Sequence, residues 1–340
     1  MRPTTKDLAK AAGVSLATVD RVLNGREGVR KKTVDAVHSA IQEIGFERNQ
    51  IAATLARKKG YRFGFVLPRS GDEYLSEILA RINEVSTWGR AEMLEASVIR
   101  IDDHDPHRAA RALARLSAED YDGIAIMAPE TPQVRDAIIR MRERGLNTIP
   151  LISNQMQDEG LPFIGIDSCS AGRTAGRLMG RFCRGRTGNL LVVTETLQSR
   201  DSLERRLGFD AVLSRHYPSL RSVPTLETHA DDDRAQSILK QAFATYEDIV
   251  GVYLMGQEAR VPLEALKTIS RCSDTMIIAH ERTPSTESAL KEDLIQAIIA
   301  QDPGHLVRSA IRVLRAHSEK RPTLGSQERI RTEILIAENL

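Results

Sequence analysis

The sequence predicts an α/β protein with a small N-terminal head of three helices, a hinge helix, and a two-lobed body of doubly wound parallel sheets. The head is predicted because residues 1–60 hold short segments with apolar residues at helical spacing, separated by glycine. The body is predicted because, from residue 61 on, short apolar runs alternate with amphipathic stretches of about 10 to 18 residues. About ten such runs exceed what one sheet usually carries, so we expect two lobes.

The head should contain three helices, at about residues 6–12, 16–23 and 31–44. Thr5 and Ser15 are suited to cap the first two helices, and Gly13 supplies the turn between them. The second helix should end at Asn24-Gly25 and the third before Gly45. Two short helices joined by a glycine turn and braced by a third form a helix-turn-helix unit, which binds DNA.

The second helix of such a unit places its first residues against base edges in the major groove. Leu16 and Ala17 suit apolar contacts such as a thymine methyl, and Arg21 suits guanine or a phosphate. The Asp20 carboxylate is suited either to accept a hydrogen bond from cytosine or to orient Arg21 without contacting DNA. Residues 1–60 carry 12 Lys and Arg against 6 Asp and Glu, which favours a polyanionic partner. A solvated basic surface, or a three-helix packing unit without a ligand, is the alternative interpretation.

A longer pattern begins at Thr4, T-x-x-D-L-A-x-x-A-G-V-S-x-x-T-V-x-R-V-L-N-G, and continues in residues 29–46 and 49–56. It resembles the DNA-binding head of LacI/GalR-family bacterial repressors. The resemblance implies a DNA-binding domain over 1–47 and a hinge helix with linker over 48–60. The chain departs from the family at Asp20, where serine is usual, and at Arg48, where proline is usual. A hinge helix this short should order only on DNA and in a dimer, and an inert linker helix is the alternative.

The resemblance also implies a role for individual residues of the head. Base-reading positions are implied for Leu16, Ala17 and Arg21. Contacts to backbone phosphates are implied for Thr5, Ser15, Thr18, Asn24 and Thr33. Contacts from the hinge are implied for Asn49, Ala52 and Leu55, with Leu55 wedged into the minor groove at the operator centre.

The body should run over residues 61–340, with helices such as 172–183, 202–215 and 233–246. Strands are expected at 62–67, 96–101, 123–127, 149–153, 163–166, 189–193, 250–255, 276–280, 295–299 and 332–337. Markers such as G-x-D-x-x-x-x-G-R and E-R-x-x-G-F resemble the type I periplasmic-binding-protein fold that follows the head in this family, in the branch similar to ribose receptors. The resemblance implies three crossings between lobe 1 (61–161 and 284–318) and lobe 2 (162–283 and 319–340). It places the ligand between the lobes, at the carboxyl ends of the strands.

Polar residues near these strand ends and helix starts are the candidates for binding an effector. They are Asp72, Tyr74, Glu130, Asp167, Arg205, Gln257, His280, Glu281 and Gln301. Guanidinium and carboxylate groups bind vicinal hydroxyls in paired hydrogen bonds, and an aromatic ring lies well against a sugar face. The set therefore predicts a sugar, polyol or derivative. For each residue taken alone, a solvated loop position is the alternative.

The sequence gives little support for a metal site, a dinucleotide site, a catalytic site or a membrane span. The three cysteines are widely spaced and form no C-x-x-C pair, and Asp102–His107 is expected to be an exposed acidic loop, so no metal is expected. The spacing of Gly172, Gly176 and Gly180 does not fit a dinucleotide site and predicts close helix packing. No catalytic constellation appears, so we expect neither an enzyme nor a cofactor. No signal peptide or membrane span is expected, which favours the cytoplasm.

The sequence therefore predicts a cytoplasmic, nucleoid-associated bacterial transcriptional regulator, more often a repressor in this family. We expect a homodimer that binds double-stranded operator DNA under the control of a small effector. The C-terminus carries no leucine heptad, so a coiled-coil tetramer is not expected. The alternatives are a sugar-binding receptor without regulatory DNA binding, a doubly wound enzyme with an accessory head, and constitutive DNA binding with a vestigial pocket.

Overall fold

The computed structural model describes residues 3–23, 28–46, 60–69, 71, 73–154, 162–197 and 199–340. The chain divides into two compact units, Met1–Gly60 and Tyr61–Leu340, called the head and the body. Five of the predicted site residues lie outside the described residues, namely Asn24, Asn49, Ala52, Leu55 and Asp72. The hinge helix predicted over 48–60 also lies almost wholly outside them.

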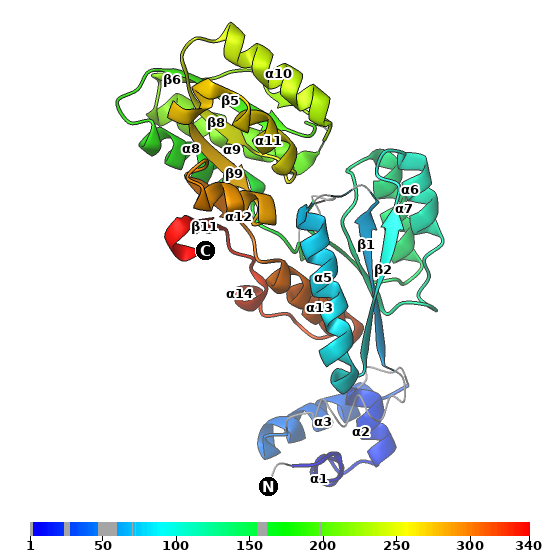
Figure 1. Ribbon diagram of the computed structural model, residues 1–340. Helices are drawn as coiled ribbons and strands as arrows, with labels where there is room; N and C mark the ends of the chain where they lie inside the picture. Colours follow the sequence, from blue (N-terminus) through cyan, green and yellow to red (C-terminus); the bar gives the residue numbers. More distant parts are fainter. Residues whose placement is uncertain are drawn as a thin grey trace. The chain divides into compact units, whose positions relative to one another are not determined.

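The head contains helices α1 (Thr5–Ala11), α2 (Leu16–Leu23) and α3 (Lys31–Ile44) (Figure 1). Thr4 caps α1, so the prediction that Thr5 does so is wrong. The Thr4 amide donates to Asp7 Oδ2 at 2.8 Å, while the Asp7 amide donates to Thr4 Oγ1 at 3.3 Å. This reciprocal capping box requires an acid three residues after the cap, and Asp7 satisfies that spacing only for Thr4.

Ser15 caps α2 as predicted, because the Thr18 amide donates to Ser15 Oγ at 3.1 Å. Gly13 has φ +63° in the turn between α1 and α2, and Gly45 has φ +61° at the end of α3. Both values lie in the left-handed region that glycine enters at little cost. A buried core holds the three helices together, formed by Leu8, Ala9, Val19, Val37, Ala40 and Phe46.

The first lobe of the body is built on a parallel sheet of order β2-β1-β3-β4. Its strands are β1 (Tyr61–Pro68), β2 (Leu94–Ile101), β3 (Gly123–Ile126) and β4 (Thr148–Pro150). Its helices are α5 (Glu73–Trp88), α6 (Pro106–Ala114), α7 (Pro132–Glu143) and α13 (Pro303–Ser318), with the 3₁₀ turn η1 (Gly89–Glu92). Helices α5 and α13 share one buried cluster with the sheet, and α6 and α7 share another on its opposite face.

The second lobe is built on a sheet of order β11-β10-β9-β8-β5-β6, with β7 also paired to β5. Its strands are β5 (Gly188–Thr194), β6 (Leu220–Ser222), β7 (Leu226–Glu227), β8 (Ile249–Leu254), β9 (Met276–His280), β10 (Ala297–Ala300) and β11 (Glu333–Leu335). Its helices are α8 (Ser168–Phe182), α9 (Arg200–His216), α10 (Asp232–Thr245), α11 (Arg260–Lys267) and α12 (Pro284–Lys291). The strands pair in parallel except β11, which is antiparallel to β10. The remaining short elements are η2 (Ser270–Asp274), α14 (Gly325–Glu328) and η3 (Ala337–Asn339).

Two predictions about the crossings between the lobes are wrong. The strand expected at 163–166 is reduced to a single bridge between Leu151 and Ile164, since this segment connects the lobes rather than extending a sheet. The second wrong prediction places 284–300 in the first lobe, whereas β10 pairs with β9 of the second lobe. The chain returns to the first lobe only with α13, which packs on β1, β3 and β4.

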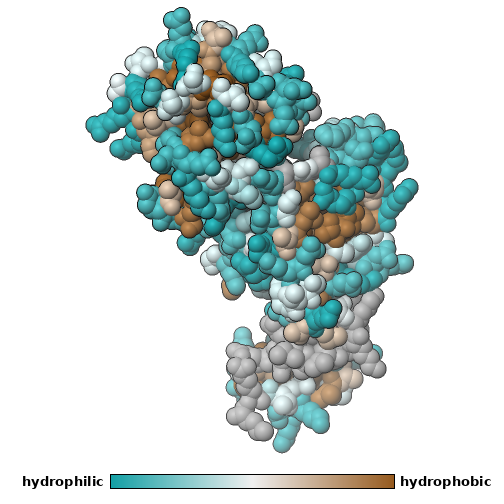
Figure 2. Space-filling view, in the orientation of Figure 1, coloured by the Kyte–Doolittle hydropathy of each residue, from teal (hydrophilic) through white to brown (hydrophobic). Residues whose placement is uncertain are grey.

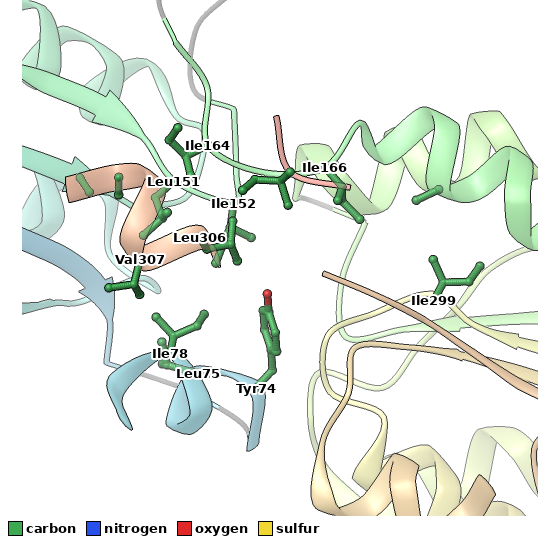
Figure 3. Close-up of a cluster of buried hydrophobic side chains, with 14 of the residues drawn as sticks. Tyr74, Leu75, Ile78, Leu151, Ile152, Ile164, Ile166, Ile299, Leu306 and Val307 are labelled. Atoms are coloured by element: carbon green, nitrogen blue, oxygen red, sulfur yellow. The ribbon is translucent and has the colours of Figure 1, made fainter. Parts of the chain in front are cut away.

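One buried apolar cluster continues from the first lobe into the second. Figure 3 shows Leu75 and Ile78 of α5 and Leu306 of α13 facing Ile152 and the other isoleucines of the crossing segments. Ile152 has φ +63°, which is an outlier for a β-branched residue. Such strain persists only where the surrounding packing holds the backbone, and Ile152 is 4% exposed.

Candidate functional site

The head presents the start of α2 to solvent. Val19 is 1% exposed and anchors the helix, whereas Leu16 is 49% exposed and Ala17, Asp20 and Arg21 are exposed beside it. An exposed leucine at the first position of a helix has no role in packing the head. The predicted base-reading residues therefore share one free surface, with the amide groups of the helix N-terminus next to them.

Of the residues predicted to contact phosphates, the structure describes Thr5, Ser15, Thr18 and Thr33. Thr5 is exposed at the start of α1, and Thr18 and Thr33 are half-buried. Ser15 Oγ bonds Thr18 Oγ1 at 2.9 Å, so both hydroxyls are held in place at the start of α2. Arg30, Lys31 and Lys32 are exposed at the start of α3 and add positive charge to the head.

The second candidate site lies at the carboxyl edge of the second sheet. Arg205 of α9 donates from Nη2 to Glu281 Oε1 at 3.0 Å and from Nη1 to the carbonyl oxygen of Met255 at 2.8 Å. Gln301 donates from Nε2 to Glu281 Oε1 at 3.2 Å. Gln301 Oε1 accepts from the amide of Ile166 in a crossing segment at 3.3 Å. The ends of β8, β9 and β10 thus meet around one guanidinium, called here the Arg205 network.

Close packing of α8 against α9 positions Arg205. A Cβ added at Gly172 would lie 2.0 Å from the Arg205 carbonyl oxygen, and one added at Gly208 would lie 2.1 Å from that of Cys169. A Cβ at Gly176 would likewise lie 2.9 Å from the Phe209 carbonyl oxygen. The prediction of close helix packing at Gly172, Gly176 and Gly180 is confirmed, since a Cβ at Gly180 would also meet the Tyr217 ring at 2.3 Å.

Burial dominates the electrostatics of the Arg205 network. It raises the pKa of Glu281 to about 7, although Arg205 and Gln301 act against it. It also lowers the pKa of His280 well below the usual value, with help from the charge of Arg205, so His280 is neutral. For Arg205, burial acts to lower the pKa, but attraction to Glu281 and Asp201 leaves it raised, so the guanidinium stays protonated.

Several buried atoms of this region are left without a hydrogen bond among the described residues. They are Arg205 Nε, His280 Nδ1 and Glu281 Oε2. His280 Nε2 bonds the Tyr253 hydroxyl at 2.7 Å, and Glu281 has φ +60°, an unusual value for a residue with a side chain. Buried polar atoms without partners are costly, and such costs concentrate at binding sites.

Polar contacts join the two lobes near this network. Glu73 of α5 accepts from the amide of Ser285 at 3.0 Å and from its hydroxyl at 2.8 Å. Glu130, which follows β3, lies 3.6 Å from Arg200 of α9. Asp201 completes the set: it accepts from Ser153 of the crossing at 3.3 Å and from Gln257 at 3.4 Å.

The structure thus brings together most of the predicted effector residues that it describes. Arg205, His280, Glu281 and Gln301 lie at the same strand ends, and Gln257 reaches them through Asp201. Tyr74 is buried at the same junction of the lobes, in the cluster of Figure 3. Glu130 joins from the first lobe through Arg200.

Asp167 does not join this group. Its carboxylate caps α8 by accepting from the amide and hydroxyl of Ser170 at 2.8 and 2.7 Å, and its side chain is 64% exposed. Asp201, Arg200 and Ser285 are not among the site residues predicted from the sequence. The run Ser199–Asp201 at the start of a helix after a buried strand was the available signal for the first two.

Within the described residues, no group of His, Cys, Asp and Glu is arranged to hold a metal ion. Asp105 of the acidic loop instead caps α6 by accepting from the amides of His107 and Arg108. None of the helices described is long and apolar enough to cross a membrane.

The sequence patterns of two families match this chain. Residues 4–49 match the bacterial regulatory proteins of the lacI family, and residues 63–322 match the periplasmic binding protein domain. The chain belongs to the periplasmic binding protein domain family, and it carries a lacI-family helix-turn-helix domain at its head. Its head is the lacI-type helix-turn-helix, and its body is the periplasmic-binding-protein domain, so the predicted family and fold class are confirmed.

Relatives and solved structures agree with this assignment. Catabolite control protein A of Streptococcus mutans is 30% identical over 179 residues, which are 52% of this chain and 51% of that protein. The chain thus spans about half the length of the first curated relatives that it matches. A glucose-galactose binding protein from Geobacillus stearothermophilus has a TM-score of 0.71 at 17% identity, covering 83% of this chain and 99% of that one. A putative LacI transcriptional regulator from Bacteroides fragilis has a TM-score of 0.69 at 23% identity, covering 83% and 98%.

Proposed function

We propose that this chain is a transcriptional regulator that binds operator DNA as a homodimer and responds to a small neutral sugar or polyol. The observation that carries the proposal is the exposed start of α2 in a lacI-type head, where Leu16 is 49% exposed. A leucine held at a helix start with no core to fill is suited to a thymine methyl.

Direct readout is assigned to Leu16, Ala17, Asp20 and Arg21 on this surface. Positioning on the phosphates is assigned to Thr5, Ser15, Thr18, Asn24 and Thr33, and minor-groove contact to Asn49, Ala52 and Leu55 of the hinge. Two heads in a dimer read two half-sites, so the operator is near-palindromic. Arg48 in place of the usual proline removes a preset φ angle, so the hinge helix depends more on DNA for its order.

The effector site is assigned to the Arg205 network and the contacts between the lobes. Its ligands are proposed to be Arg205, His280, Glu281, Gln301 and Gln257, with Tyr74, Glu130 and Asp72 from the first lobe. Arg205 Nε is a donor, His280 Nδ1 donates or accepts according to its tautomer, and Glu281 Oε2 accepts when ionised and can donate when protonated; all three are buried and without described partners. Hydroxyl groups satisfy both kinds of atom at once, because each donates and accepts.

The charge of this region favours a neutral effector over an anionic one. The carboxylates of these contacts are Glu73, Glu130, Asp201 and Glu204, with Glu281 partly ionised near pH 7, against the guanidiniums of Arg135, Arg200 and Arg205. A carboxylate or phosphate on the ligand would enter an excess of negative charge. The sugar binding named for the Geobacillus stearothermophilus protein of the same fold supports a sugar as the class.

Effector binding regulates DNA binding only if the two states of the body bind the effector unequally. Residues of both lobes contact each other across the junction. An effector bound between the lobes therefore changes the geometry in which the lobes close. We propose that this change reaches the paired hinge helices and alters operator affinity. Repression, a cytoplasmic location on the nucleoid and a role in binding rather than catalysis belong to the same proposal.

The test compares two variants in two assays. Arg21→Ala should abolish selection of a specific duplex from a random DNA pool and leave sugar-induced thermal shifts intact. Arg205→Lys should reduce the thermal shifts and leave DNA selection by the unliganded protein intact. A protein that selects no duplex over random competitor, with or without sugars, contradicts the proposal.

A sugar receptor without regulatory DNA binding is the second candidate, because the body matches a sugar-binding protein over 99% of that chain. It predicts sugar-induced thermal shifts together with no DNA selection, an outcome that the same experiment separates.

A further inference from the structure

One outer face of the second lobe combines a groove, exposed cations and exposed apolar side chains. The groove has a volume of about 580 Å³ and runs along α8, between α9 and β11. Its lining includes Arg173, Arg177, Leu178, Arg215, His216 and Ile334. It is called here the α8–α9 groove, and neither the DNA-binding surface nor the Arg205 network uses it.

The positive charge of the α8–α9 groove is largely uncompensated. Arg177 and Arg215 form no ion pair within the described residues, and Arg173 approaches the exposed Asp167 at 4.0 Å. Arg177 lies over the Tyr217 ring, with Cζ 5.7 Å from its centre, so its guanidinium is held at the groove. The pKa of His216 is lowered, first by desolvation and then by the charges of Arg177 and Arg215. The groove therefore attracts carboxylates.

The apolar part extends beyond the groove. Leu203, Leu207 and Ala211 follow one another at four-residue spacing on α9, and Leu207 is 66% exposed. Ile334 and Ile336 on the other side are 43% and 41% exposed. Figure 2 shows brown surface on this lobe beside the place where Figure 1 draws β11. Single exposed leucines are ordinary, but several along one charged groove mark an interaction surface.

The positive charge of the α8–α9 groove distinguishes among the molecules that could bind in it. A second copy docked groove to groove across a two-fold axis would add its own unpaired arginines to the same interface, which is repulsive. A small anion would satisfy the arginines but leave Leu203 and Leu207 uncovered. A helix with acidic side chains beside an apolar stripe satisfies both parts, in the manner of helix-in-groove recognition.

We propose that the α8–α9 groove docks an acidic amphipathic helix of a partner protein. Its carboxylates pair with Arg177 and Arg215, and its apolar side chains cover Leu207 and Ile334. The docking helix would lie on the outer face of α9, whose buried face carries Arg205. This surface is independent of the proposed sugar and DNA sites.

The experiment measures fluorescence anisotropy of a labelled helical peptide built from leucine and glutamate in a helical repeat, titrated with the full chain. A leucine–lysine peptide of the same pattern is the matched probe. We expect the acidic peptide to bind with a Kd on the order of tens of micromolar, about −6 kcal/mol, and more weakly at higher salt. The double variant R177E/R215E and the variant L207E should each weaken binding at least about tenfold, by loss of about 1.4 kcal/mol.

R140E is the control, because Arg140 is 68% exposed on α7 of the first lobe. It should leave peptide binding unchanged. The proposal is overturned if the acidic peptide does not bind, if the lysine peptide binds as well, or if R140E weakens binding as much as the groove variants. Sedimentation equilibrium of L207E gives one more decisive outcome: a changed oligomeric state would identify the groove as a contact between copies of this chain and overturn the proposal.

Discussion

Replacing Glu281 with glutamine is expected to stabilise the body by about 3 kcal/mol at pH 7.5 but by less than about 1 kcal/mol at pH 5. Burial raises the pKa of Glu281 to about 7 in the folded chain, against an ordinary value of 4.5. The folded state therefore binds a proton more tightly than the unfolded state does. Stability from this group is fully present below pH 4.5 and is lost as the pH rises to about 7.

The magnitude follows from the size of that shift. Each unit of pKa is worth about 1.4 kcal/mol, so a difference between about 7 and 4.5 corresponds to about 3 kcal/mol. Glutamine has the shape of the protonated acid and still accepts from Arg205 and Gln301, so it keeps the low-pH stability at every pH. The gain in stability would be accompanied by weaker effector binding, because binding sites contain groups that lower stability but are needed for function.

Urea unfolding followed by circular dichroism at pH 5 and pH 7.5 gives the free energies. The control is Glu84→Gln, since Glu84 is 53% exposed in a surface pair with Arg81. It should change stability by less than about 0.5 kcal/mol at either pH. The reasoning is refuted if Glu281→Gln destabilises the chain at pH 7.5, because the ion pair with Arg205 would then outweigh the cost of burial.

Three further outcomes are expected. Thr4→Ala should cost the head about 1 kcal/mol by removing the capping box, whereas Thr5→Ala should cost little, as thermal unfolding of each variant will show. Gly172→Ala should cost more than about 3 kcal/mol in urea unfolding, because the added methyl would meet the Arg205 carbonyl oxygen at 2.0 Å; Gly185→Ala, with open space at φ +81°, should cost about 1 kcal/mol. Any neutral sugar that raises the melting temperature should bind at least about tenfold more tightly than its carboxylated or phosphorylated form, measured by calorimetry at equal ionic strength.

The head was predictable because its signals are local. The second and third helices match their predicted ranges, since glycine turns, caps and apolar spacing act within a few residues. The error at Thr5 arose because two adjacent threonines both suit a cap, and only the position of Asp7 decides between them. Strand β9 also matches its predicted range, because a short apolar run between polar residues leaves no other choice.

The body was less predictable in segments whose structure depends on long-range tertiary contacts and not on the local sequence. The segment 163–166 is apolar enough for a strand, but it crosses between lobes and meets only Leu151. The predicted effector residues converge because the carboxyl ends of parallel strands share one edge. The contact between Glu73 and Ser285, by contrast, joins residues 212 positions apart and leaves no trace in local sequence. Asp167 also follows a predicted strand, but its carboxylate caps the start of α8 and does not join the Arg205 network.

The contacts between the lobes bear on how an effector could switch this chain. Glu73 contacts Ser285 and Glu130 contacts Arg200, and partly exposed contacts of this kind are worth about 1 kcal/mol or less each. These contacts therefore add little to the stability of the closed form, in which the two lobes are in contact. The free energies of the open and closed forms should differ by only a few kcal/mol. A shift from about 1:99 to 99:1 requires about 5.5 kcal/mol of differential binding. A ligand of micromolar affinity supplies about 8 kcal/mol in total, so it can drive that shift only if most of its contacts, including those to Arg205 and Gln301, form in one state alone.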